Sequence, residues 1–276
     1  MSKFADAVPV LMYHHVSPNP GLVTVSPETF EDHMALLAER GYTTLTANQF
    51  LDFLQGSFQA PQRSVLITFD DGYLDNYVYA YPILKSHGLR AAIFCVTSWI
   101  ADGPCRNHAG HSATLPICPN HSGCKQAIAA GQSDSVILRW SEIEKMSRDD
   151  TIEIHSHTHT HTRWDKTIVD VAERNQQLAT DLLQSQQALR ARLGHESRHL
   201  CWPQGYFDAA YQAIATKLGY TAQYTTMQHV NTRATAPDSI GRNVAKELPA
   251  DWLANRLFIY SRPWLGSVYH RLRGSL

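Results

Sequence analysis

Short, mainly apolar runs alternate with amphipathic segments along most of the chain. The runs have the length of β-strands, and they occupy residues 8–13, 64–69, 90–96, 151–154, 198–202 and 220–226. Runs that are apolar on both faces and are separated by helices are typical of a parallel sheet covered by helices. A chain of 276 residues, 43% of them hydrophobic, is long enough for one large α/β domain or two small ones. We predict an α/β fold and assign residues 1–276 to one domain.

Helix start and stop signals lie between these runs. The clearest helix begins after Ser26, has Pro27 at its first position and ends at Gly41. Further helices are predicted over residues 73–87, from a capping box of Ser141 and Glu144, over 165–194 and over 208–219. Active sites of such folds form at the carboxyl ends of the strands, so the residues that follow each strand are the candidates for chemistry.

Two adjacent carboxylates, Asp70 and Asp71, follow the apolar run at 64–69 directly. Such a pair is costly at a buried strand end unless a positive group compensates it. For an isolated Asp-Asp-Gly the simpler interpretation is a tight turn, in which an aspartate caps the next helix and Gly72 eases the bend. A histidine tract elsewhere in the chain changes this balance.

The tract IEIHSHTHTHTRWD, residues 152–165, places histidines at 155, 157, 159 and 161. In an extended chain, residues four apart are separated by ~13 Å, and only neighbours two apart, at ~6.6 Å, could chelate one ion. If the chain turns helically, residues four apart come within ~6 Å. Either His157 with His161 or His155 with His159 could then join an aspartate in a three-ligand site for Zn²⁺ or a similar ion. The alternative is a solvated polar loop.

A third strand end carries the turn CWPQGYF, residues 201–207. Pro203 and Gly205 force a tight turn, which can aim backbone N–H groups into a site and so form an oxyanion hole. The same Pro-x-Gly pattern also occurs in ordinary turns.

These stretches resemble the motifs of the polysaccharide deacetylase family, the NodB-homology domain of carbohydrate esterase family 4. TFDDG is similar to the first motif, EIHSHTHTH to the second and WPQG to the third. The openings PVLMYHHVS and FEDHMALLAERGYTTLT resemble the subgroup that contains poly-β-1,6-GlcNAc deacetylases. The resemblance covers about residues 8–245 and implies a distorted (β/α) barrel, which agrees with the alternation of strands and helices.

The resemblance also implies a ligand set for one divalent ion, with Zn²⁺ as first choice and Co²⁺ or Ni²⁺ as alternatives. Asp71 takes the place of the family's metal-binding aspartate. The family's second motif usually follows Glu-x-Gly-Ser, so EIHS makes His157 and His161 the ligands. His155 then stands in the glycine's place, and we expect His159 to point elsewhere.

The implied reaction is hydrolysis of an amide. A divalent ion polarises the carbonyl and lowers the pKa of its water towards ~7. Asp70 is implied as the general base, and the backbone N–H of Gln204 as a donor to the oxyanion. Departures from the family pattern concern the third motif, where Cys201 replaces an arginine that orients the base. Arg242, in SIGRNV, is a candidate replacement.

The family's fifth motif, whose histidine is the general acid, has no clear counterpart. Three histidines are candidates for that role: His14, His15 and His229. We assign it to His14, although an ordinary strand-end histidine is an equally good interpretation. For sugar binding the candidates are Trp202, Pro203 and Trp164, and the two tryptophan rings also suit a core.

An insertion at about 101–138 contains six potential metal ligands, mostly three residues apart. They are Cys105, His108, His111, Cys118, His121 and Cys124. Paired Cys and His at this spacing are typical of structural zinc. The insertion could therefore hold a second, structural Zn²⁺, or it could be a substrate-shaping loop in which the cysteines only pack.

A tail at about 250–276 mixes aromatic and basic residues. Such a stretch can contact a membrane surface, but a packed terminal helix is the more common structure. The net charge of −1 gives no indication of nucleic-acid binding. We expect a cytoplasmic protein, because the start lacks a signal-peptide pattern and no apolar run approaches ~18 residues. Association of the tail with the inner face of the membrane is the alternative to its packing.

We therefore expect a metal-dependent hydrolase that removes N-acetyl groups from an N-acetylhexosamine, GlcNAc or GalNAc. The glycan would be a cell-envelope polysaccharide, a lipopolysaccharide core or a lipid-linked precursor. The alternative is a non-catalytic metal- or glycan-binding domain, and Asp70 argues against it because metal binding needs no free base. A glycoside hydrolase fits poorly, since its two carboxylates should be ~5 Å or more apart.

Overall fold

The computed structural model describes the backbone of residues 3–273 and the side chains as far as Tyr269. Its centre is a parallel sheet whose strands follow the order β10-β1-β5-β6-β7-β8-β9, with β4 added to β5. The strands are β1 (Val10–Tyr13), β4 (Thr43–Thr44), β5 (Ser64–Asp71), β6 (Ala91–Cys95), β7 (Ile152–Ser156), β8 (His199–Cys201), β9 (Ala222–Tyr224) and β10 (Asn243–Val244). The predicted strand runs are therefore confirmed, and β4 and β10 were not predicted.

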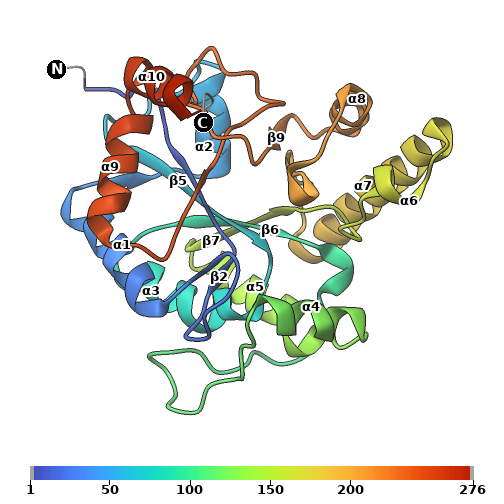
Figure 1. Ribbon diagram of the computed structural model, residues 1–276. Helices are drawn as coiled ribbons and strands as arrows, with labels where there is room; N and C mark the ends of the chain where they lie inside the picture. The colour runs from blue at the N-terminus through green and yellow to red at the C-terminus, as the bar shows by residue number, and fades with distance from the viewer. Residues whose placement is uncertain (1–2, 274–276) are drawn as a thin grey trace.

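The sheet curls until its two edges approach each other (Figure 1). Tyr224, at the end of β9, forms a parallel bridge with Ile240, which lies just before β10. The backbone N–H of Thr225 donates to the carbonyl oxygen of Ile240 at 2.9 Å. The structure is thus a distorted, incompletely hydrogen-bonded (β/α) barrel, as predicted.

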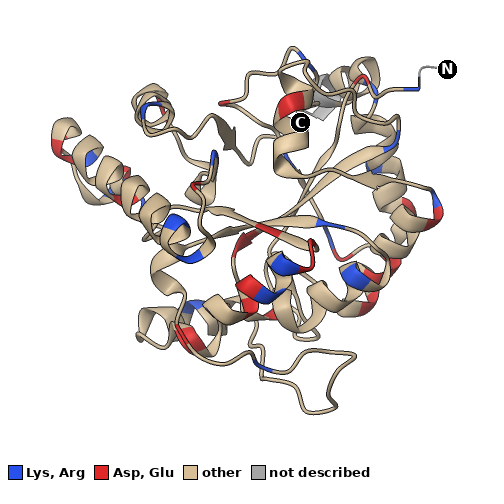
Figure 2. Ribbon diagram, turned by 180° about the vertical axis from the view of Figure 1, so that it is seen from behind, with Lys and Arg blue, Asp and Glu red and all other residues tan. Residues whose placement is uncertain are grey.

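Helices surround this sheet (Figure 1). They are α1 (Pro27–Glu39), α2 (Ala47–Leu54), α3 (Tyr81–Ser86), α4 (His121–Ala129), α5 (Trp140–Arg148), α6 (Trp164–Thr167), α7 (Val171–Leu193), α8 (Ala209–Lys217), α9 (Ala250–Tyr260) and α10 (Pro263–Arg273). On the side seen in Figure 2, acidic and basic residues are interspersed along the outer helices. None of the described helices combines the length and apolar character that crossing a bilayer requires.

The start of α1 shows how local sequence sets these elements. The Ser26 side chain accepts a hydrogen bond from the backbone N–H of Thr29 at 3.1 Å, as expected for a helix cap. Phe30, Met34 and Leu37 are fully buried, because their spacing puts them on one side of the helix. This face packs into the main hydrophobic core.

Two helix predictions were wrong in detail. The segment 165–194 is not one helix, since it breaks after α6 and restarts where Asp170 caps α7. The predicted capping box of Ser141 and Glu144 is absent from α5, whose start is instead fixed by Glu142 accepting a hydrogen bond from the backbone N–H of Arg139 at 2.8 Å, while the Ser141 hydroxyl donates to the carbonyl of Gly103. The tail was predicted to pack, and α9 does so through Leu253 and Leu257.

The amino-terminal end of the barrel contains a buried histidine, His199, at the start of β8. Its Nε2 lies 3.0 Å from Oδ1 of Asn48, and its Nδ1 lies 3.3 Å from the hydroxyl of Tyr224. The ring centroid of His155 is 4.5 Å away. Burial lowers the pKa of His199 well below its ordinary value, and His155 adds to this effect. The imidazole is therefore neutral in the folded protein.

This histidine should make the free energy of unfolding depend on pH. Below about pH 6.5 residue 199 is protonated in the unfolded chain but not in the folded chain. The free energy of unfolding therefore falls on acidification by up to about 1.4 kcal/mol per pH unit. His199→Gln should reduce that slope between pH 6.5 and 5 by about one proton. Urea denaturation at several pH values measures it, and an unchanged slope in the variant would contradict the account.

Candidate active site

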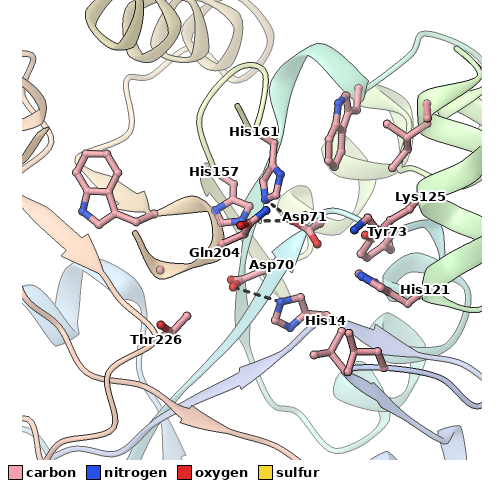
Figure 3. Close-up of a pocket in the computed structure, with 17 residues that line it drawn as sticks. His14, Asp70, Asp71, Tyr73, His121, Lys125, His157, His161, Gln204 and Thr226 are labelled. Atoms are coloured by element: carbon pink, nitrogen blue, oxygen red, sulfur yellow. Dashed lines mark ion pairs between the residues drawn. The ribbon is translucent and has the colours of Figure 1, made fainter. Parts of the chain in front are cut away.

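A pocket of about 560 Å³ opens at the carboxyl ends of β5, β7 and β8. Asp70 and Asp71 enter it from β5, His157 and His161 from the tract after β7, and His14 from the end of β1 (Figure 3). The parallel register aligns these strand ends, with Asp71 opposite Cys95 and Cys95 opposite Ser156. Residues far apart in the chain thus meet at one rim, as the fold predicts.

Three potential metal ligands converge in this pocket. Nε2 of His157 is 3.3 Å from Oδ1 of Asp71, and Nε2 of His161 is 3.5 Å from the same oxygen. This oxygen is buried and makes no hydrogen bond. Two atoms that are each about 2.0–2.2 Å from a tetrahedral ion lie roughly 3.3–3.6 Å apart. The donor set and its spacing therefore fit a divalent ion such as Zn²⁺, as predicted.

The backbone of the tract turns sharply to bring the two histidines together. Thr158 and His161 have φ angles of 69° and 59°, and Asp71 at the end of β5 has φ 72°. These left-handed conformations are costly for residues with a side chain and concentrate at functional sites. The N–H of His161 donates to the Thr158 hydroxyl at 3.0 Å, which stabilises the turn. The tract thus leaves the extended conformation after β7, as metal binding by residues four apart requires.

Hydrogen bonds outside the ligand set fix the orientation of His157. Its Nδ1 donates to the carbonyl oxygen of Cys201 at 2.8 Å, so the Nε2 lone pair faces Asp71. Burial lowers the pKa of His161 to about 4, which leaves this imidazole neutral and able to bind metal near pH 7. Burial also disfavours a charge on His157, but Cys201 together with the carboxylates of Asp71 and Asp70 outweighs it and raises the pKa. A cation would displace that proton.

Asp70 is excluded from this ligand set by a different partner. Oδ1 and Oδ2 of Asp70 accept hydrogen bonds from Arg242 at 2.6 and 2.8 Å. Arg242 is fully buried, and its Nε donates to the carbonyl of Thr225 at 2.9 Å. Burial opposes ionisation of Asp70, but the guanidinium more than offsets it and holds the pKa below its ordinary value. Asp70 is therefore an ionised carboxylate beside the candidate metal site.

The arginine that orients Asp70 therefore comes from the segment before β10. The Cys201 thiol, at the place of the family's motif arginine, lies 3.0 Å from Nη2 of Arg242. Potential ligand atoms of Asp70, His157 and Cys201 also lie within 4.8 Å of one another. The guanidinium charge inside that second group disfavours a cation there. The proposed replacement by Arg242 is thus confirmed in position.

The three candidates for the general acid occupy different places. His14 lines the pocket, with its Nε2 3.8 Å from Oδ2 of Asp70. Burial lowers the pKa of His14. His15 is buried against Asp75, and Nε2 of His229 bonds to the carbonyl of Ser239. Position therefore favours His14, whose role as acid stays a prediction.

The remaining histidines of the tract lie outside the ligand set. Nδ1 of His159 is 2.9 Å from the Thr97 hydroxyl, and Nδ1 of His155 is 3.0 Å from the Ser197 hydroxyl. The choice of His157 and His161 over the pair His155 and His159 therefore agrees with the geometry.

The turn after β8 lines the pocket with Gln204 and Gly205. Both have left-handed backbones, with φ angles of 54° and 69°. A Cβ atom on Gly205 would lie 2.0 Å from the hydroxyl oxygen of Thr226, so only glycine fits. The assignment of the Gln204 N–H to an oxyanion remains a prediction.

The predicted sugar-binding residues lie in different places relative to the pocket. Trp202 lines the pocket, but it is 1% exposed and stacks against Phe207, and Pro203 is buried. Trp164 lies outside the pocket lining, and its indole N–H donates to Asp181 at 3.5 Å, so its role in sugar binding stays a prediction. Sequence reasoning missed Trp99, a half-buried residue that lines the pocket 5.3 Å from the His161 ring. Its place just after β6 is the signal that could have identified it.

The predicted second zinc site is not formed. Among the described residues, the groups of three or more potential ligands are Asp71 with His157 and His161, and Asp70 with His157 and Cys201. The six side chains of the insertion point to different surroundings. Cys105 is exposed, Cys118 packs with Leu74 and Val78, Cys124 lies in the main core, His108 and His111 stack on each other, and His121 lines the pocket. The three-residue spacing thus spreads these side chains over a loop and the start of α4.

Comparisons with known proteins assign this fold and site to a family. The polysaccharide deacetylase family model matches residues 58–223, so the chain belongs to that family. Poly-β-1,6-N-acetyl-D-glucosamine N-deacetylase of Escherichia coli (strain K12) is 23% identical over 234 residues, which are 83% of this chain and 34% of that protein. YxkH of Bacillus subtilis (strain 168) is 45% identical over 89 residues, 32% of each chain. The matches therefore span about a third of the length of these relatives.

Solved structures share the fold. The Streptococcus pyogenes deacetylase PplD, in complex with acetate, has a TM-score of 0.71 at 20% identity, over 92% of this chain and 99% of that one. IcaB from Ammonifex degensii has a TM-score of 0.72 at 22% identity, over 94% of this chain and 98% of that one. At these identities the likeness concerns the fold.

The ligand geometry predicts one zinc per chain. Asp71→Asn and His161→Ala each remove one of three protein ligands and should weaken zinc binding on the order of a hundredfold or more. Cys118→Ser with Cys124→Ser should leave the zinc content unchanged. Elemental analysis after dialysis against zinc measures this. Two equivalents per chain that fall to one in the double cysteine variant would contradict the structure.

Proposed function

We propose that this chain hydrolyses the N-acetyl group of an N-acetylhexosamine, with a divalent cation, Zn²⁺ as first choice, held by Asp71, His157 and His161. One observation carries the proposal. Two adjacent buried carboxylates have different partners, since Asp71 faces two imidazole nitrogens and Asp70 is held by Arg242. A metal ligand and a free base are the two roles that metal-assisted amide hydrolysis needs.

The chain's own groups are placed for the steps of this reaction. A cation in the site supplies Lewis-acid chemistry, which polarises the acetamide carbonyl and acidifies water. Asp70 takes a proton from the attacking water, whose oxygen bonds to the carbonyl carbon. As the carbon–nitrogen bond breaks, the amine nitrogen takes up the proton that Asp70 accepted from water, and His14, whose Nε2 lies 3.8 Å from Oδ2 of Asp70, is placed to relay that proton. The products are acetate and the free amino sugar.

The pocket suits a sugar residue of a glycan. Its volume of about 560 Å³ falls in the range of small-molecule sites, and Trp99 offers a half-buried aromatic face beside His161. The likeness to a poly-β-1,6-N-acetyl-D-glucosamine N-deacetylase supports GlcNAc as the sugar. A cell-envelope polysaccharide, a lipopolysaccharide core and a lipid-linked precursor are the glycans to test, and a location at the inner membrane face belongs to the same proposal.

Asp70→Asn should separate catalysis from metal binding. The amide cannot accept the proton, so acetate release from GlcNAc oligosaccharides should fall about 10²–10⁴-fold while zinc content stays at the native value. Asp71→Asn is the matched variant and should lose both zinc and activity. Retained activity in Asp70→Asn would contradict the assignment. A wild-type protein that binds zinc but releases no acetate from any glycan would favour the non-catalytic alternative.

The partner of Asp70 can be tested by moving the arginine. Arg242→Ala leaves a buried carboxylate without its cation, which should cost about 3–5 kcal/mol of stability and most of the activity. Adding Cys201→Arg places a guanidinium at the family's motif position. The thiol that now occupies this position lies 3.6 Å from Oδ1 of Asp70. The double variant should recover part of both losses in denaturation and acetate assays. A double variant that is worse than Arg242→Ala alone would argue against this role.

A further inference from the structure

A chain of polar side chains leads from the core to the pocket and takes no part in the proposed reaction. It consists of Asp75, His15 in β2 (His15–Val16), and His121 at the start of α4. Oδ2 of Asp75 lies 2.6 Å from Nδ1 of His15, and Nε2 of His15 lies 3.2 Å from Nδ1 of His121. Asp75 and His15 are 1% and 0% exposed, whereas His121 lines the pocket. The His15 ring also stacks on Tyr73, with centroids 3.8 Å apart, so its orientation is fixed.

The hydrogen bonds around Asp75 determine where the protons lie. Its Oδ1 accepts from the N–H of Val16 and from Nδ2 of Asn76, at 3.3 and 2.9 Å. Because a carboxylate only accepts, Nδ1 of His15 must carry a proton. In a neutral His15, Nε2 is then an acceptor, so Nδ1 of His121 donates to it. A neutral His121 consequently has an unprotonated Nε2.

His121 is held neutral by its surroundings. Burial lowers its pKa. Among the described residues, Nε2 of His121 has no hydrogen-bond partner. Lys125, four residues on and thus on the same face of α4, also lines the pocket. In Figure 3 both project toward the pocket on the side of Asp71 opposite His157. The insertion therefore offers a fixed acceptor to whatever fills the pocket.

We propose that His121 binds a hydroxyl group of the sugar substrate through Nε2, with Asp75 and His15 as positioning residues. This inference rests on the proposed function, because a glycan hydroxyl is the donor that such an acceptor would meet. It gives the insertion a role in substrate selection. A sugar that lacks the matching hydroxyl leaves this acceptor unpaired and binds less tightly.

Binding can be measured without turnover. Zinc-loaded Asp70→Asn protein is titrated calorimetrically with a panel of GlcNAc and GalNAc oligosaccharides, and the tightest binder is kept. His121→Asn places a polar atom near Nδ1 and preserves only the contact with His15, whereas His121→Gln places one near Nε2. The Asn variant should bind about tenfold more weakly and the Gln variant within about threefold of the parent. His111→Ala, an exposed histidine of the same insertion, is the matched control and should bind like the parent.

Monodeoxy derivatives of that oligosaccharide identify the hydroxyl. One derivative should bind the parent protein about tenfold more weakly than the intact sugar does. The His121→Asn variant should bind that derivative and the intact sugar equally well, because removing the hydroxyl and removing the imidazole delete the same interaction. Losses that add at every hydroxyl position overturn the proposal. Tighter binding of the oligosaccharide by His121→Asn than by His121→Gln overturns the proposal as well, since His121 would then act only through its contact with His15.

The positioning role has a spectroscopic signature. In Asp75→Asn the amide oxygen must face the two donors Val16 and Asn76, so its NH₂ faces Nδ1 of His15 and the protons shift along the chain to Nε2 of His121. The ¹⁵N chemical shift of that nitrogen, assigned with the His121→Gln spectrum, should move from the unprotonated to the protonated range. An unchanged shift overturns the positioning assignment.

The outcomes separate this inference from the proposed function. Failure of the wild-type protein to release acetate refutes the proposed function. The calorimetric comparison of the His121 variants still tests whether His121 binds a sugar hydroxyl. Failure of the whole panel to bind overturns the inference, whatever other acetylated compound the protein hydrolyses.

Discussion

The structure depends on two adjacent carboxylates at the end of a buried strand. Asp70 and Asp71 are 3% and 6% exposed, and an unpaired charge removed from water to this extent costs several kcal/mol. The protein compensates the two charges differently. Arg242 satisfies Asp70 with two hydrogen bonds, whereas Asp71 keeps an unsatisfied oxygen between two imidazoles. Neighbouring residues of one type thereby become a base and a candidate ligand.

Strand geometry keeps the two roles apart. Asp70 lies within β5, whereas the backbone of Asp71, the last residue of that strand, is left-handed, so the two adjacent side chains reach different partners. The left-handed backbone at Asp71 ends the strand at this point, and the one at His161 folds the tract back towards it. These strained positions lie within the proposed metal site, where binding of a cation would offset their cost.

Much of the fold follows from the sequence because buried parallel strands are apolar on both faces. The runs at 64–69 and 90–96 therefore stand out, whereas the two-residue strand β10 is too short for a pattern to show. The choice of the two histidine ligands was harder to predict, since spacing alone allowed two histidine pairs. The family motif was needed to select His157 and His161. Arg242 reaches Asp70 across 172 residues of chain, and no local pattern encodes such a contact. The insertion misled prediction because spacing does not say where its side chains point.

Anomalous scattering at the zinc edge, from crystals of the zinc-loaded protein, tests the central claim most directly. The account predicts one strong peak per chain, about 2.0–2.2 Å from Oδ1 of Asp71 and from the Nε2 atoms of His157 and His161, with Asp70 still bound to Arg242. A peak among the cysteines of the insertion, or an ion coordinated by Asp70 in place of Asp71, would contradict it.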